Sequence, residues 1–351
     1  MTAIIAAVIV FSVLVLAHEL GHFVTAKLAR VRVEEFGLGY PPRVFGVKIG
    51  ETTYSLNALP FGGFTKMSGE EDPRVLGSLA GKSILTRIIV LGAGSFMNAI
   101  LPLFLFSLAF MIPHDVVAGE VLVEAVTPSS PAAVSGIEAG DTLLEFAGRP
   151  VANSGELQPL IQTRLGEKTS LLIRKSDGST RMVRLTPRWE PPAGEGAMGV
   201  KLRTINYTTV RKTYAPLQAI SKGATEYIDT YLLLKNGIIR IIIGSAPLQF
   251  GGPVAITQIT AEVAQLGISP LLEFAAIISI NLAIFNLLPI PALDGGRILF
   301  VMIEWLRRGK RISAKTEGLV HLIGFVSLLF FALIITLTDI LRIINGGSLI
   351  P

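Results

Sequence analysis

Two histidines and a glutamate near the start of the chain have the spacing of a metal-binding helix. Residues 18–22 read His-Glu-Leu-Gly-His and fit the pattern His-Glu-x-x-His. On a helix, His18 and His22 lie one turn apart on the same face, so both imidazoles can bind one zinc ion. Glu19 lies beside them, where its carboxylate can take a proton from a water molecule held by the metal. The pattern predicts a zinc-dependent hydrolase; the alternative is a polar cluster that bridges helices.

Such an enzyme needs a third protein ligand and a fourth position open to water. The chain contains no cysteine, and its two other histidines, His114 and His321, lie near apolar runs at less suitable depths. Asp294 is the better candidate, because it ends the otherwise uncharged run 274–293. Taken alone, Asp294 fits equally well as an ordinary carboxylate at a helix end.

The residues around Asp294 predict a broken helix. Pro289 and Pro291 interrupt helical structure, and Gly295 and Gly296 allow the backbone to turn closely. Irregular backbone at membrane depth is tolerated where it lines a polar cavity, so a broken helix tip is suited to complete a metal site.

Four apolar runs indicate helices that cross a membrane. Residues 1–26 contain a single charged side chain, and 88–112, 274–293 and 318–338 contain none. Each run reaches the roughly 20 residues that span a bilayer. Only 16% of the chain is charged and its mean hydropathy is +0.59, which argues against a simple soluble enzyme and excludes a disordered chain. The first run lacks a basic segment before it and is too long for a cleavable signal peptide.

The short loops are basic and set the expected orientation. Nine Lys and Arg residues lie between the first two runs and six between the last two, so both loops should be cytoplasmic. Both termini and residues 113–272 then face outward. Basic flanks of this kind account for the net charge of +5, so no nucleic-acid partner is expected.

The first loop and the outward segment are predicted to contain β-structure. Segments 32–36, 44–49 and 52–56 are typical of short strands, and an apolar hairpin beside the first helix is either a lid or a membrane-dipping sheet. The outward segment should hold strands at 120–126, 141–146, 171–174 and 181–185 and a helix at 156–165. Residues 130–141 resemble the helix-and-turn signature of PDZ domains; another small β-barrel is the alternative.

These patterns predict a multi-pass α-helical membrane protein with four transmembrane helices, a membrane-associated β-hairpin and an inserted β-rich PDZ-like domain. The expected organisation is transmembrane helices 1 and 2 with the cytoplasmic hairpin loop in 1–112, the extracytoplasmic PDZ-like domain in 113–202, an extracytoplasmic juxtamembrane segment with an amphipathic helix in 203–270, and transmembrane helices 3 and 4 in 271–351.

Taken together, the motifs resemble the site-2 protease family of intramembrane zinc metalloproteases. The resemblance rests on the His-Glu-x-x-His motif, on Asn-x-x-Pro-x-Pro-x-Leu-Asp-Gly at 286–295, on Pro-Phe-Gly-Gly at 60–63, on Lys-Met-Ser-Gly-Glu at 66–70 and on Asn98 in the second span. The inserted domain is similar to that of the bacterial RseP-type branch, whose best-known members carry two PDZ domains where this chain has room for one. That departure affects the substrate filter rather than the chemistry.

The resemblance implies zinc bound by His18, His22 and Asp294, with Glu19 as general base and acid. It implies a location in the bacterial inner membrane, with the active site toward the cytoplasm. It also implies single-span membrane protein substrates, such as anti-sigma factors or signal-peptide remnants, that a site-1-type protease has already trimmed. An unwound substrate would add to an exposed strand edge, for which the strand candidates lie within 44–56. Asn281 and Asn286 would bind the substrate backbone or the oxyanion, or else link helices.

Two other functions fit some of these features. A divalent metal transporter could use two histidines and an aspartate in membrane helices, although transporters usually show repeat halves. An inactive membrane scaffold could use the PDZ-like domain for partners, although it would not need Glu19 beside two ligands.

Overall fold

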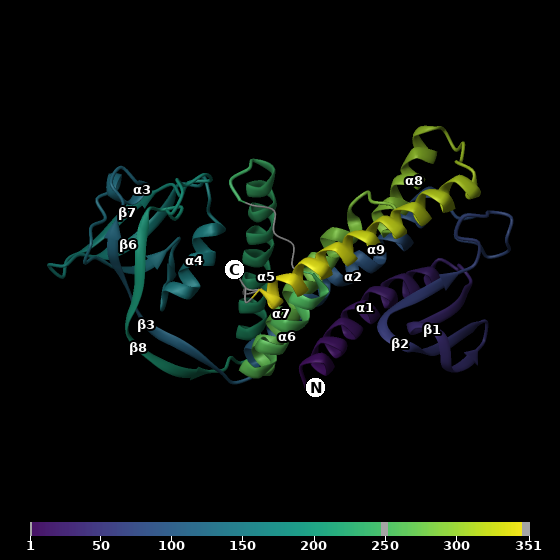
Figure 1. Ribbon diagram of the computed structural model, residues 1–351, viewed down its shortest axis with the longest axis horizontal. Coiled ribbons are helices and arrows are strands. Elements are labelled where there is room, and N and C mark those ends of the chain that lie inside the picture. Colours follow the sequence, from purple (N-terminus) through teal and green to yellow (C-terminus); the bar gives the residue numbers. More distant parts are fainter. Residues whose placement is uncertain (1, 247–251, 346–351) are drawn as a thin grey trace. The chain divides into compact units, whose positions relative to one another are not determined.

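The computed structural model describes residues 2–246 and 252–345, which form two compact units (Figure 1). One unit is built from 1–109 and 250–351, the other from 110–249. Residues 1, 247–251 and 346–351 lie outside the described part, as do the side chains of residues 2–4, Pro60 and Phe61.

The first unit consists of helices and a β-hairpin that packs beside α1 (Figure 1). Its elements are α1 (Thr2–Leu28), β1 (Val33–Ile49), β2 (Thr52–Met67), α2 (Ile84–Met111), α6 (Pro253–Leu266), α7 (Ile268–Leu287), α8 (Asp294–Leu306) and α9 (Ala314–Ile344). Four of these helices are long and apolar enough to cross a membrane, over Ile5–Leu28, Ile84–Met111, Ile268–Leu287 and Ala314–Ile344. The prediction of four spans is confirmed, and the chain is a multi-pass membrane protein.

The third span begins earlier and ends earlier than the charge pattern indicated. A glycine with a φ of 121°, Gly267, separates α6 from α7, so the helix already starts at Ile268. It ends at Leu287 because Leu288 precedes a proline and takes an extended conformation, with a ψ of 143°. Asp294 therefore begins a new helix, α8, instead of ending the third span.

The predicted short strands of the first loop are joined into two long, bent strands. Phe36 in β1 pairs with Tyr54 and also with Thr65, so the first half of β1 lies between the two halves of β2. The strand expected to end at Leu56 continues to Met67. Apolar side chains on the outer strand, among them Phe45 and Ile49 at 64% exposure each, lie on the surface, where a membrane-associated hairpin would present them to lipid.

The second unit is the predicted β-rich domain. Its elements are β3 (His114–Val126), α3 (Pro131–Val134), β4 (Thr142–Phe146), β5 (Arg149–Pro150), α4 (Ser154–Gln162), β6 (Thr169–Arg174), β7 (Thr180–Leu185), β8 (Val200–Lys212) and α5 (Pro216–Ile242). The sheet has the order β7-β6-β4-β3-β8, with β5 paired to β4. Buried residues from several strands, such as Val121, Phe146 and Leu171, form its core. The strand β8, which the sequence analysis did not predict, pairs with β3 along most of its length.

Candidate metal centre

His18 and His22 of α1 and Asp294 of α8 bring three possible ligand atoms together. Nε2 of His18 lies 3.2 Å from Nε2 of His22 and 3.2 Å from Oδ2 of Asp294, and Nε2 of His22 lies 3.3 Å from the same oxygen. The two histidines are buried, with 9% and 6% of their surfaces exposed. Across residues 2–246 and 252–345, this is the one group of His, Cys, Asp and Glu side chains with the geometry to hold a metal ion.

The spacing of these three atoms fits a zinc ion. Nitrogen and oxygen ligands lie about 2.0–2.2 Å from tetrahedral zinc, which places any two ligand atoms about 3.3 Å apart. The observed separations of 3.2 to 3.3 Å match that value on all three edges. Three protein ligands leave one tetrahedral position for water or substrate, as in catalytic zinc sites.

Both imidazoles are oriented by hydrogen bonds at their other nitrogen. Nδ1 of His22 lies 2.8 Å from the carbonyl oxygen of Val90, so the imidazole donates there and leaves Nε2 unprotonated for a metal. Nδ1 of His18 lies 3.4 Å from the amide nitrogen Nδ2 of Asn98, and the buried Oδ1 of that amide has no hydrogen-bond partner in the described chain. Exchanging the nitrogen and oxygen of this amide would let Oδ1 accept a hydrogen bond from Nδ1 of His18, and Nε2 of His18 would then be free to bind a metal.

Helix α2 approaches the site closely because small residues line its inner face. A Cβ atom added at Gly94 would lie 2.7 Å from both Cε1 and Nε2 of His18, so only glycine fits there. The hydroxyl of fully buried Ser95 lies 3.5 Å from Oδ2 of Asp294. The sequence analysis did not predict Gly94 and Ser95. They precede Asn98 by four and three residues in an apolar span, and such small residues beside a polar one indicate close helix packing.

Glu19, the residue after His18 in α1, contacts strand β2. The hydroxyl of Thr65 donates to the carbonyl oxygen of Glu19 over 3.0 Å, and a Cβ atom added at buried Gly63 would lie 3.4 Å from Cγ of Glu19. Residues 63–67 form one edge of the first sheet, since they pair on one side with β1 and with no second strand in the described chain. The strand edge beside Glu19 is therefore in 63–65. Segment 45–49, within the range 44–56 predicted from the sequence, forms the opposite edge of the same sheet, because it pairs only with 52–56 among the described residues.

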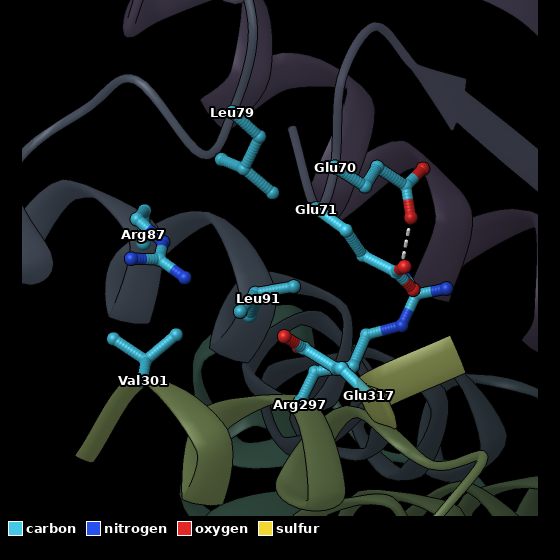
Figure 2. Close-up of a pocket in the computed structure, with 8 residues that line it drawn as sticks. All are labelled: Glu70, Glu71, Leu79, Arg87, Leu91, Arg297, Val301 and Glu317. Atoms are coloured by element: carbon cyan, nitrogen blue, oxygen red, sulfur yellow. Dashed lines mark hydrogen bonds and ion pairs between the residues drawn. The ribbon is translucent and has the colours of Figure 1, made fainter. Parts of the chain in front are cut away.

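Helix α8, which begins with Asp294, is fixed by two ion pairs, of which the one between Arg87 and Glu304 is buried. Arg297 reaches Glu70 in the loop after β2, beside a cavity of about 20 Å³ that is lined largely by charged side chains (Figure 2). Burial alone would lower the pKa of the Arg297 guanidinium, but the charges of Glu70 and Asp294 outweigh it and raise that pKa above its usual value. The last turn of α8 is held by Glu304, whose Oε2 lies 2.5 Å from Arg87 of α2.

The two asparagines of α7 occupy different surroundings. The amide nitrogen of Asn286 lies 3.5 Å from Nδ1 of His18, so the structure places it at the site. The amide nitrogen of Asn281 instead donates to the carbonyl oxygen of Ile277 in its own helix over 2.9 Å. His114 lies in the second unit, where Nδ1 bonds the carbonyl oxygen of Ile112, and it does not contribute to the cluster.

Two imidazoles and a carboxylate at zinc spacing, with a glutamate beside them and helices long enough to cross a membrane around them, define a membrane-embedded zinc metalloprotease. The comparisons agree with this class. Residues 6–331 match peptidase family M50. A protein of Clostridium perfringens is 40% identical over 345 residues, which cover 96% of this chain and 98% of that protein.

Two further relatives carry descriptive names. Zinc metalloprotease RasP of Geobacillus kaustophilus is 30% identical, with 96% of this chain and 97% of the relative covered. The Regulator of sigma-W protease RasP of Bacillus subtilis is 27% identical, with 97% and 98% covered. The chain belongs to peptidase family M50, the site-2 protease family of zinc metalloproteases. This assignment favours the enzyme over the transporter and the scaffold.

Proposed function

We propose that the chain is an intramembrane endopeptidase that cleaves single-span membrane proteins after another protease has removed most of their outer domain. The observation that carries the proposal is the triangle of ligand atoms at 3.2 to 3.3 Å beside Glu19, among helices long enough to span a membrane. His18, His22 and Asp294 would hold zinc. Zinc bound there would polarise the scissile carbonyl and lower the pKa of a water molecule toward about 7.

Glu19 is the general base and acid of this mechanism. Its carboxylate takes the proton of the attacking water and passes it to the nitrogen of the leaving amine. Glu19 is partly buried, and strand β2 approaches its Cγ atom at Gly63. The base and the strand edge at 63–65 are thus on the same side of α1.

A substrate helix must unwind before its backbone can reach these groups. The unwound segment would leave N–H and C=O groups without partners in lipid, and addition to the edge at 63–65 would satisfy them. Asn286, beside His18, is placed to bind substrate backbone or the developing oxyanion. Asn281 would contact substrate only after the hydrogen bond from its amide to the carbonyl oxygen of Ile277 is broken.

The orientation and the substrate class are parts of the same proposal. The basic loops before α2 and before α9 favour a cytoplasmic active site in the inner membrane, with the PDZ-like unit outside as a steric gate against untrimmed substrates. The name of the Bacillus subtilis relative, a regulator of sigma-W, supports anti-sigma-factor-like substrates; signal-peptide remnants are the second class.

Metal removal tests the proposed reaction. Full-length protein in liposomes with a single-span reporter that has a short outer segment should cleave the reporter within its span. A zinc chelator should abolish cleavage and added zinc should restore it, because the three ligands must be filled for hydrolysis. A reporter with a large folded outer domain is the control for the gate and should be cleaved slowly. Cleavage that persists after zinc has been removed to background would contradict the proposal.

A further inference from the structure

The position of Asp294 depends on a short loop rather than on a continuous helix. Helix α7 ends at Leu287 and α8 begins at Asp294, and no side chain caps the start of α8 at Leu293. The loop 288–293 therefore sets where the carboxylate lies relative to the imidazoles of α1.

This loop contains a backbone conformation that its residue type does not favour. Ala292 has a φ of 79°, in the left-handed region that side chains other than glycine rarely adopt. Such a conformation persists only where its surroundings hold it. The backbone N–H of Ala292 donates to Nδ1 of His321 over 2.9 Å, so a side chain of α9 holds the strained residue two positions before Asp294.

Helix α9 contacts the loop at two successive turns of one face. One turn beyond His321, a Cβ atom added at Gly324 would lie 2.7 Å from the carbonyl oxygen of Pro291, so the helix backbone itself packs on the loop. The imidazole of His321 also packs against Phe300 of α8, with ring centroids 5.4 Å apart. The loop, α8 and α9 thus meet at this imidazole.

The chemistry of the imidazole fits an acceptor role. Because Nδ1 accepts a hydrogen bond, the neutral ring carries its proton on Nε2. That Nε2 is buried and has no hydrogen-bond partner in the described chain, which costs stability and would favour an apolar residue at this position. Within the described residues, the hydrogen bond from the backbone N–H of Ala292 is the one hydrogen bond that His321 makes through its side chain.

We propose that His321 is a positioning residue of the metal centre, which keeps Asp294 at ligand distance by fixing the loop 288–293. The proposal rests on the proposed role of Asp294 as a ligand. It gives a function to the one intramembrane histidine outside the His-Glu-x-x-His motif, and that function is not metal binding.

The test compares acceptors at position 321 in the full-length protein in detergent. His321→Asn keeps an acceptor oxygen at the place of Nδ1, whereas His321→Gln keeps size and polarity but moves the acceptor one bond farther out. Zinc affinity would be measured by competition with a chromophoric chelator, and metal geometry by the visible spectrum of the cobalt-substituted protein. Loss of a residue that orients a ligand weakens metal binding about 10- to 100-fold, which we expect for His321→Gln. We expect His321→Asn to bind zinc within about 3-fold of the unaltered protein, well inside that range.

Three controls separate the possible outcomes. Thermal unfolding should show that both variants are folded, and His114→Asn controls for the loss of a histidine elsewhere. Equal zinc affinity and cobalt spectra for His321→Gln and the unaltered protein would overturn the proposal, as would equally weak binding by both folded variants. Unchanged zinc affinity in Asp294→Asn would instead refute the proposed ligand set, and the role of His321 would fall with it.

Discussion

Replacing Glu19 with glutamine should abolish proteolysis while zinc stays bound. Glutamine has nearly the same size and keeps the carbonyl oxygen, but it cannot accept the proton of the attacking water. Positioned general bases contribute about 100- to 10,000-fold to a rate, so cleavage of a single-span reporter should fall by at least about 100-fold. The contact between α1 and β2 at Thr65 uses the backbone of residue 19 and should be unaffected.

The matched control is Glu51→Gln, which neutralises an exposed carboxylate that pairs with Lys27 at the hairpin turn. This variant should cleave the reporter as the unaltered protein does. Zinc content per chain should be equal in all three proteins. Reporter cleavage by Glu19→Gln within a few-fold of the unaltered rate would rule out Glu19 as the base, and loss of zinc would show that Glu19 holds the metal instead.

Adding one methyl group at Gly94 should have a comparably large effect through a different cause. A Cβ atom there would lie 2.7 Å from His18 Cε1 and Nε2 and closer still to Nε2 of His22, and atoms cannot remain so close. The rings cannot simply move aside, because Val90 and Asn98 hold their other nitrogens. Displacing catalytic groups by about 1 Å can cost about 100-fold in rate, so we expect Gly94→Ala to lose most of its activity and to bind zinc more weakly.

Gly92→Ala provides the same chemical change two residues earlier in α2. The nearest atom to a Cβ at that position is Cδ1 of Ile298 at 3.8 Å, an ordinary contact. Reporter cleavage and zinc affinity of Gly92→Ala should match those of the unaltered protein. If Gly94→Ala also matched it, the close packing of α2 against the two imidazoles would be wrong.

The metal-site residues could be predicted because their signals are local. His18, Glu19 and His22 lie within five residues, and the helical repeat alone places the histidines on one face. Asp294 was found as the first charge after a long apolar run that two prolines interrupt. That the three ligand atoms would meet was an inference, because nothing local specifies how α1 and α8 pack.

The supporting residues were harder to predict because their roles arise only from packing. Gly94 and Ser95 are ordinary small residues of an apolar span until α2 meets α1 and α8. Likewise, the edge at 63–65 follows from a bend that lets β1 pair with both halves of β2, whereas strand propensity suggested separate short strands. His321 appeared only as a rejected ligand, since its partner is a backbone N–H 29 residues away.

Zinc K-edge X-ray absorption on the purified full-length protein tests the metal centre most directly. We expect one zinc per chain with two imidazole nitrogens and carboxylate oxygen at about 2.0–2.2 Å, no sulfur, and one further light ligand. Asp294→Asn should weaken zinc binding and change the contribution of oxygen ligands to the absorption spectrum, while the contributions of both imidazoles remain. A site with a single imidazole, or an Asp294→Asn spectrum and affinity identical to those of the unaltered protein, would contradict the assignment of His18, His22 and Asp294 as the ligands.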